Sequence, residues 1–86
     1  MDNSQRIERM EQLLTDELTP SEMEIIDESH LHAGHAGAKE GKGHFRLRIA
    51  SAAFDGVRPL QCHRLIFAAL GDMMQTDIHA LSIEII

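Results

Sequence analysis

Residues 45–51 read Phe-Arg-Leu-Arg-Ile-Ala-Ser, and this stretch decides the fold class. Apolar residues alternate with charged or small ones, which is the pattern of a strand with one buried and one solvated face. Residues 23–28, Met-Glu-Ile-Ile-Asp-Glu, form a second short strand candidate, and residues 80–85, Ala-Leu-Ser-Ile-Glu-Ile, alternate again near the end of the chain. The sequence therefore predicts a small sheet of three strands.

The remaining apolar segments show helical periodicity. Ser4 is the expected N-cap of a helix over about residues 4–18, in which apolar side chains recur on one face. A second helix is predicted from Pro59 or Leu60 to Met74, again from apolar residues at helical spacing. The expected order is thus α-β-β-α-β.

This order limits the topology. A strand, a helix and another strand suggest a right-handed crossover, which makes the last strand parallel to the second. Helices would then cover one face of a small, three-stranded mixed sheet, so we expect an α+β fold. With 86 residues, the whole of 1–86 is expected to form one domain with a modest core and no need for a structural metal.

Cysteine content and hydropathy indicate the compartment. Cys62 is the chain's single cysteine and cannot form an internal disulfide. No apolar run has the length of a membrane span or of the core of a signal peptide. We therefore expect a soluble, cytoplasmic protein that does not bind a membrane.

The net charge of -6 is distributed unevenly. Residues 1–28 are strongly acidic, whereas residues 39–64 are locally basic through six cationic residues: Lys39, Lys42, Arg46, Arg48, Arg58 and Arg64. Such a segment can contact phosphate or an acidic protein surface, although an acidic chain as a whole repels DNA. It is equally consistent with a solvated face that balances the acidic helix.

A loop rich in histidine and glycine separates the first two predicted strands, over about residues 29–43. Residues 30–44 read HLHAGHAGAKEGKGH and contain four of the six histidines. A glycine-rich loop can bend until imidazole nitrogens converge on iron, zinc, copper or nickel. A connection of this length is more often functional or disordered than a simple hairpin. Its composition also fits a surface loop without a function.

Several local patterns follow one another from about Ile25 to the end of the chain. They are Asp27-Glu28-Ser29 followed by His32 and Gly34-His35, then His44-Phe45, then Ser51 with Phe54 and Gly56, then Gln61-Cys62-His63-Arg64, and finally Ile78-His79-Ala80-Leu81. Together they resemble the BolA family. The resemblance implies a KH-like (class II) α+β fold, although the Gly-x-x-Gly nucleic-acid clamp of true KH domains is absent from a suitable turn between helices.

Two features depart from the family pattern. Cys62 stands where the family commonly has arginine before its His-Arg pair, and the chain stops at Ile86, where the family commonly continues into a further helix. Both positions fall near the expected partner or nucleic-acid surface. Cys62 itself lies among helix-start residues without a second thiol, so a buried or half-exposed spectator is the simpler interpretation.

The resemblance also implies metal ligands. His79 would bind a shared 2Fe-2S cluster, and the loop would supply the second ligand, which is His32 by its spacing after Ser29, with His35 as the nearest substitute and His30 less favoured. A monothiol glutaredoxin and its bound glutathione would supply the other half of the site, and the chain alone is expected to hold no cofactor. Taken without the resemblance, His79 either lies beside the core, which is the commoner case of a structural histidine, or points out at the end of the sheet.

The function expected from these observations is a non-catalytic adaptor in iron-sulfur cluster trafficking and iron homeostasis. The chain would be a monomer alone and a heterodimer with glutaredoxin. The alternative is a DNA-binding transcriptional regulator that uses its KH-like helices. Arg46, Arg48, Arg58 and Arg64 would then contact phosphate, while His63 with Arg64 either helps to dock a partner or is solvated.

Two further interpretations concern single residues. His44, at the start of the second strand, is expected to be an edge residue rather than a ligand. Catalysis is not expected, because Asp27, Ser29 and His32 supply triad residue types without an evident oxyanion site.

Overall fold

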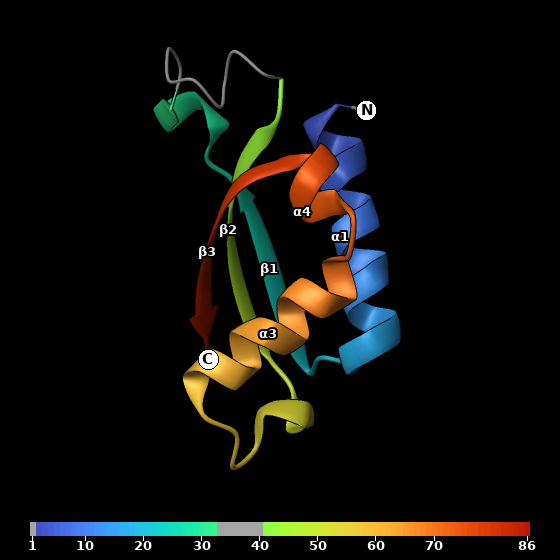
Figure 1. The fold of residues 1–86 in the computed structure, drawn as a ribbon, viewed down its shortest axis with the longest axis vertical. Coiled ribbons are helices and arrows are strands. Elements are labelled where there is room, and N and C mark those ends of the chain that lie inside the picture. Colours follow the sequence, from blue (N-terminus) through green and yellow to red (C-terminus); the bar gives the residue numbers. More distant parts are fainter. Residues whose placement is uncertain (1, 33–40) are drawn as a thin grey trace.

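The computed structural model describes residues 2–32 and 41–86, with the backbone alone at 31 and 32. Helices lie on one side of a single sheet (Figure 1). The elements in chain order are α1 Asn3–Leu18, β1 Glu22–Asp27, the 3-10 helix η1 Ser29–His32, β2 Gly43–Ala50, the 3-10 helix η2 Ala52–Phe54, α3 Pro59–Leu70, α4 Met73–Thr76 and β3 Ile78–Ile85. The expected order of main helices and strands is confirmed, with the short elements added between them.

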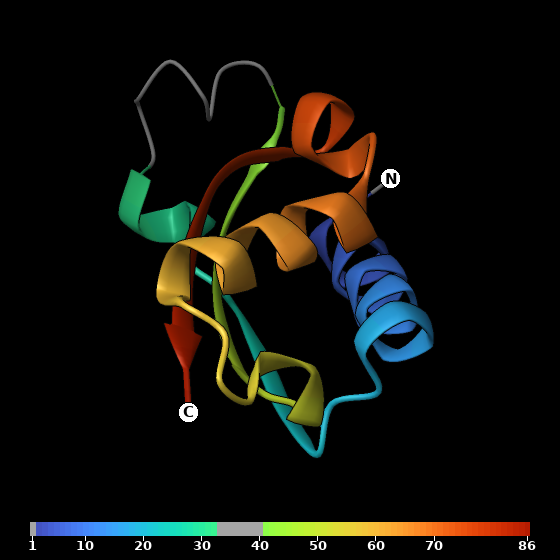
Figure 2. The ribbon, with the colours of Figure 1, turned by 60° about the horizontal axis from the view of Figure 1, so that its bottom comes forward.

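The sheet has the order β1-β2-β3, with β1 antiparallel and β3 parallel to the central strand β2. The alternation that predicted β2 is confirmed, since Phe45, Leu47 and Ile49 are buried while Arg46 between them is exposed. The buried residues contribute to the core beneath α1 and α3, which pass over the same face (Figure 2). The opposite face carries the charged residues of the sheet.

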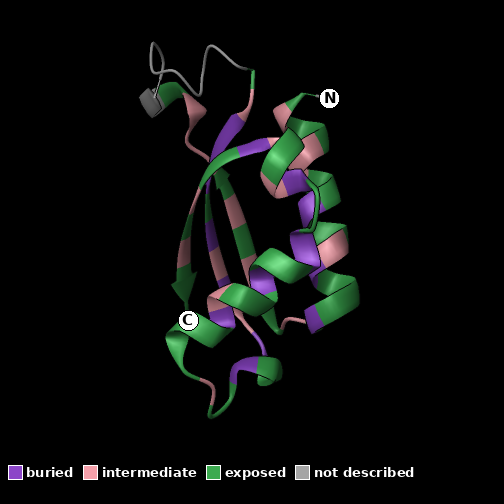
Figure 3. Ribbon diagram, in the orientation of Figure 1, coloured by how far each residue is buried: buried purple, intermediate pink, exposed green. Residues whose placement is uncertain are grey.

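The core is mainly aliphatic, with Phe45 and Phe54 as its aromatic members. Among its fully buried side chains are Met10 and Leu14 of α1, Leu47 of β2 and Ile66 of α3, so burial runs along the inner side of both helices and along β2 (Figure 3). In the described part of the chain, no helix has the length and apolar character needed to cross a membrane.

The start of α1 differs from the prediction. Asp2, and not Ser4, is the N-cap: its side chain accepts a hydrogen bond from the Gln5 backbone N–H, and the Gln5 side chain accepts one from the Asp2 N–H. This reciprocal capping box satisfies two amides that a cap at Ser4 would leave for water. The helix consequently includes Ser4 in its first turn.

The second predicted helix is also divided. It was expected to continue to Met74, but α3 ends at Leu70, and Gly71 adopts a positive φ of 55° before α4 begins. Glycine reaches this conformation without the steric penalty of a Cβ atom. Met73 nevertheless returns to the core and is buried, which explains why the apolar spacing resembled one uninterrupted helix.

Candidate functional site

The start of β3 contains a bulge. Gly43 pairs with Ile78, whereas the next residue of β2, His44, pairs with Ala80, so His79 is the extra residue on β3. A bulge redirects a side chain out of the regular alternation. Ile78 is buried and His79 is exposed. Of the two orientations left open for His79, the structure therefore has the imidazole accessible to solvent at the end of the sheet.

His44 lies beside His79, and here the prediction of an edge residue is wrong. β2 is the central strand, and His44 is only 4% exposed. Its ring centroid is 5.0 Å from that of His79, with the planes tilted by 50°. Its backbone is also bonded to the residues after β1, because its N–H donates to Ser29 Oγ at 3.0 Å and its carbonyl accepts from Glu28 N–H at 2.8 Å. The buried ring of His44 therefore lies next to the exposed ring of His79.

The segment with the other predicted ligand begins at the same end of the sheet. Ser29 opens η1 directly after β1, and its backbone N–H donates to Asp27 Oδ1 at 2.9 Å. His32 is the last residue of η1, and its side chain lies outside the described part, as does the whole of His35. The side chain of Ser29 in η1 is thus hydrogen-bonded to the start of β2, which in turn pairs with the start of β3 (Figure 1).

Two carboxylates at this end have perturbed pKa values. Burial raises the pKa of Asp27, but hydrogen bonds from Ser29 and Asn3 outweigh it and hold that pKa below its ordinary value. The pKa of Asp77 is lowered by a hydrogen bond from the Thr76 hydroxyl and by Arg6. Both groups are therefore anionic hydrogen-bond acceptors at neutral pH.

The predicted basic residues fall into two separate groups. Arg46 and Arg48 lie on the sheet face opposite α1 and α3, where each is paired with carboxylates: Arg46 with Glu28 at 3.1 Å, and Arg48 with Glu84 at 2.9 Å and Glu24 at 3.3 Å. The hydrogen bonds to Glu84 and Glu24 raise the pKa of Arg48. Because these arginines already have anionic partners, this face offers little uncompensated positive charge.

The second group belongs to α3. Arg58 is the N-cap residue of that helix, Arg64 is exposed on it, and His63 is half-buried. Sequence reasoning missed their apolar neighbours, Leu60 and Phe67, whose side chains are 61% and 40% exposed. Their spacing of i, i+7 could have revealed this strip, because it lies opposite the buried positions of α3. The structure therefore does not bring the α3 residues together with the histidines or with Arg46 and Arg48.

Cys62 is buried, in agreement with the expectation of a buried or half-exposed spectator. Its side chain is 2% exposed, and its thiol donates a hydrogen bond to the Val57 carbonyl at 3.6 Å. Across residues 2–30 and 41–86, no group of three or more histidine, cysteine, aspartate or glutamate side chains is arranged to hold a metal ion. The described residues therefore offer paired imidazoles at the bulge, and no complete metal site.

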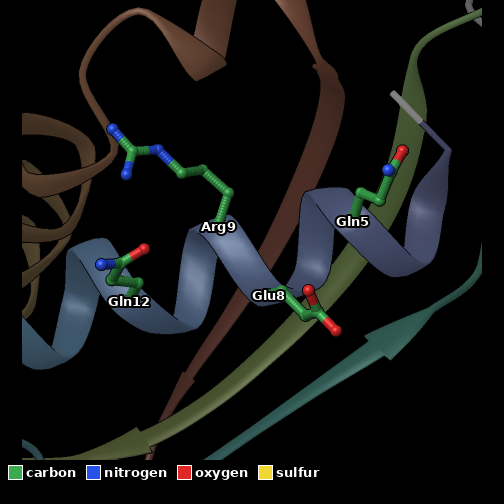
Figure 4. A pocket seen from close by; sticks show the side chains of 4 residues that line it. All are labelled: Gln5, Glu8, Arg9 and Gln12. Carbon is green, nitrogen blue, oxygen red and sulfur yellow. The ribbon is translucent and has the colours of Figure 1, made fainter.

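A shallow depression of about 260 Å³ lies elsewhere, on α1. All its lining side chains come from successive turns of that one helix: Gln5, Glu8, Arg9 and Gln12 (Figure 4). The lining carries one charge of each sign and none of the predicted site residues. It is a surface feature of an exposed helix.

Comparison with known proteins agrees with this architecture. A family model described as BolA-like protein matches residues 14–86. The chain is 42% identical over 81 residues to Protein BOLA1, chloroplastic, of Arabidopsis thaliana, covering 91% of this chain and 51% of that protein. It is 36% identical over 75 residues to the DNA-binding transcriptional regulator BolA of Vibrio cholerae, covering 87% of this chain and 68% of that protein.

A solved structure supports the same assignment. The BolA domain of SufE1 from Arabidopsis thaliana superposes with a TM-score of 0.81 at 43% sequence identity, covering 93% of this chain and 88% of that one. The predicted α+β class is thereby confirmed. This chain spans about half the length of BOLA1, so the likeness concerns the domain described above. The chain belongs to the BolA-like protein family.

Proposed function

We propose that the chain is a non-catalytic cytoplasmic adaptor in iron-sulfur cluster trafficking and iron homeostasis, which shares a 2Fe-2S cluster with a monothiol glutaredoxin. The observation that carries this proposal is the exposed imidazole of His79, which a β-bulge turns out of the strand at the end of the sheet. The loop with His32 and His35 begins at that same end, through η1. Neutral imidazole nitrogen is a suitable iron ligand.

The donor count explains why a partner is needed. A 2Fe-2S cluster takes four ligands, which are commonly thiolates, although a histidine pair can replace two of them. Cys62 is buried on α3, and its thiol donates a hydrogen bond to the Val57 carbonyl. The chain therefore offers two imidazoles, from His79 and from the loop. The cysteine of a glutaredoxin and the thiol of its glutathione would complete the set.

The alternative, binding of DNA, has one observation in its favour. Arg58 and Arg64 are exposed on α3, and within the described residues neither forms an ion pair. The other two candidate phosphate contacts are paired with carboxylates, so the sheet face with Arg46 and Arg48 would attract a phosphate backbone only weakly. Two arginines give only a weak electrostatic contact with phosphate. We therefore rank DNA binding second.

A mixing experiment tests the proposal. An anaerobically loaded monothiol glutaredoxin is titrated with the chain, and the visible circular dichroism of the cluster is followed. His79→Ala should abolish the spectrum specific to the heterodimer. Arg9→Ala is the control, because this exposed side chain lies on α1 beside none of the predicted site residues, and it should leave the spectrum unchanged.

Melting curves of both variants establish that the fold is intact. A His79→Ala chain that binds and transfers cluster as the unmutated chain does would contradict the proposal. A gel shift with sequence preference that persists near physiological salt, and that Arg58→Ala with Arg64→Ala abolishes, would favour the DNA alternative instead.

A further inference from the structure

The first turns of α1 are hydrogen-bonded to both segments that lead to the proposed ligands. Arg6 Nε donates to Asp77 Oδ1 at 3.0 Å, just before β3, and Arg6 Nη1 donates to Asn3 Oδ1 at 2.9 Å. Asn3 Nδ2 then donates to Asp27 Oδ2 at 3.1 Å and to Ser29 Oγ at 3.0 Å, where η1 begins. One guanidinium and one amide therefore connect the start of β3 to the start of η1.

Each end of this connection is close to a proposed ligand in the chain. Asp77 precedes His79 by two residues, and its carbonyl accepts a hydrogen bond at 2.9 Å from the backbone N–H of Gly43, the first residue of β2. Ser29 precedes His32 by three residues, and its hydroxyl oxygen also accepts the N–H of His44. Movement at either end would therefore be passed to the backbone that carries an imidazole.

The connection is partly shielded from water. The side chains of Arg6 and Asp77 are only 13% and 16% exposed. Charge-assisted hydrogen bonds in such surroundings are screened less by salt than surface pairs are. Arg9, one turn later on α1, provides a contrast: it is exposed beside the shallow depression (Figure 4) and forms no ion pair with any described residue.

Holding α1 in place does not require these bonds. The helix is already anchored through the buried side chains of Met10, Leu14 and Leu18 and is capped by Asp2. The family match begins at residue 14, so the connection also involves residues before the matched segment. What the bonds add is a fixed spacing between η1 and the start of β3.

We infer that Arg6 and Asn3 are positioning residues, which hold η1 and the start of β3 at a fixed spacing for the shared cluster. This inference rests on the proposed function. Neither side chain binds the cluster. Together they restrict the backbone of two elements, η1 and β3, that carry the proposed ligands, in the way that outer residues orient the ligands of other metal sites.

Two variants test separately the bond from Arg6 to Asp77 and the bonds from Asn3 to Asp27 and Ser29. Arg6→Ala removes both the bond to Asp77 and the support of the Asn3 amide. Asn3→Ala leaves the Arg6 pair with Asp77 but releases η1. In the chain alone, amide hydrogen exchange should therefore accelerate at His44 in both variants and at Gly43 only in Arg6→Ala. Exchange at core amides such as Leu47 should be unchanged, whereas a general loss of stability would accelerate all of them.

The heterodimer gives the second readout. With loaded glutaredoxin, Arg6→Ala should shift the visible circular dichroism and accelerate cluster loss to a chelator by about tenfold, the low end for losing an outer-sphere partner. Arg6→Lys should recover part of this, because an ammonium can pair with Asp77 but does not form the same fork to Asn3. Arg9→Ala, the matched control, should stay within about twofold of the unmutated chain.

The variants give different results when only the positioning role is wrong and when the proposed function itself is wrong. If His79→Ala abolishes the heterodimer spectrum while Arg6→Ala and Asn3→Ala behave like Arg9→Ala, the positioning role is wrong and the proposed function stands. If His79→Ala has no effect on the spectrum, the proposed function fails and the positioning role fails with it. Exchange that accelerates equally at Leu47 and His44 would also overturn the inference. It would show that the substitutions lower the free energy of unfolding of the whole domain and do not act on the connection alone.

Discussion

Gly43 is the position at which a single added methyl group should disturb both the core and the candidate site. It is the first residue of β2, opposite Ile78. A Cβ atom at Gly43 would overlap the ring carbons Cε2 and Cζ of Phe45 and lie 3.0 Å from Asn3 Oδ1. Phe45 is 1% exposed, so its ring has no solvent-filled space into which it can move. We therefore expect Gly43→Ala to force a displacement of packed atoms.

The expected cost follows from this overlap. Overpacking by one methyl group in a dense core costs about 1–3 kcal/mol. For a domain of this size, about 2 kcal/mol corresponds to a fall in Tm of roughly 8–16 °C. Gly43 is not among the residues with positive φ, so the cost should arise from contact and not from backbone strain. Replacing Phe45 by leucine should relieve part of it.

A double-mutant cycle measures this directly. Urea unfolding followed by far-ultraviolet circular dichroism is compared for Gly43→Ala, Phe45→Leu and the pair, which should show a coupling free energy of about 1 kcal/mol. Gly56→Ala is the control, because Gly56 has a φ of 70° and no atom within 4 Å of its added Cβ. The cost of Gly56→Ala in free energy of unfolding should therefore be the same with phenylalanine or with leucine at position 45. A Gly43→Ala chain within about 0.5 kcal/mol of the unmutated one would refute the reasoning.

Three further effects are expected. Leu14→Ala, at a fully buried position of α1, should lower the free energy of unfolding by about 2–5 kcal/mol in urea titration, whereas Arg48→Ala should change it by less than about 1 kcal/mol because its partners are exposed. The lowered pKa values of Asp27 and Asp77 should contribute stability that is complete above about pH 4 and lost as pH falls through the folded-state pKa values. In Asp27→Asn, the free energy of unfolding should therefore fall less steeply on acidification than in the unmutated chain. Cys62 should react with a thiol reagent only after unfolding, and rapid reaction of the native chain would contradict its burial.

The sequence by itself determined the regular elements, because side-chain period is a local property. Alternation in residues 45–51 was enough to predict a strand with one buried face, and helical spacing was enough to predict a helix ending at Leu18. The parallel pairing of β2 with β3 followed from the order of elements and the preferred handedness of a crossover. The sequence predicted Cys62 to be a buried or half-exposed spectator at the start of a helix, and the structure has it buried.

The tertiary structure alone decided the details of the candidate site. No local pattern marks His79 as a bulged residue or His44 as buried, because both depend on the register between two strands that are far apart in the sequence. The pair of Arg6 and Asp77 joins residues 71 positions apart, and such a contact exists only after α1 has packed on the sheet. Periodicity identifies which face of an element is buried, whereas the position of each polar group depends on which distant groups the completed packing brings within hydrogen-bond distance.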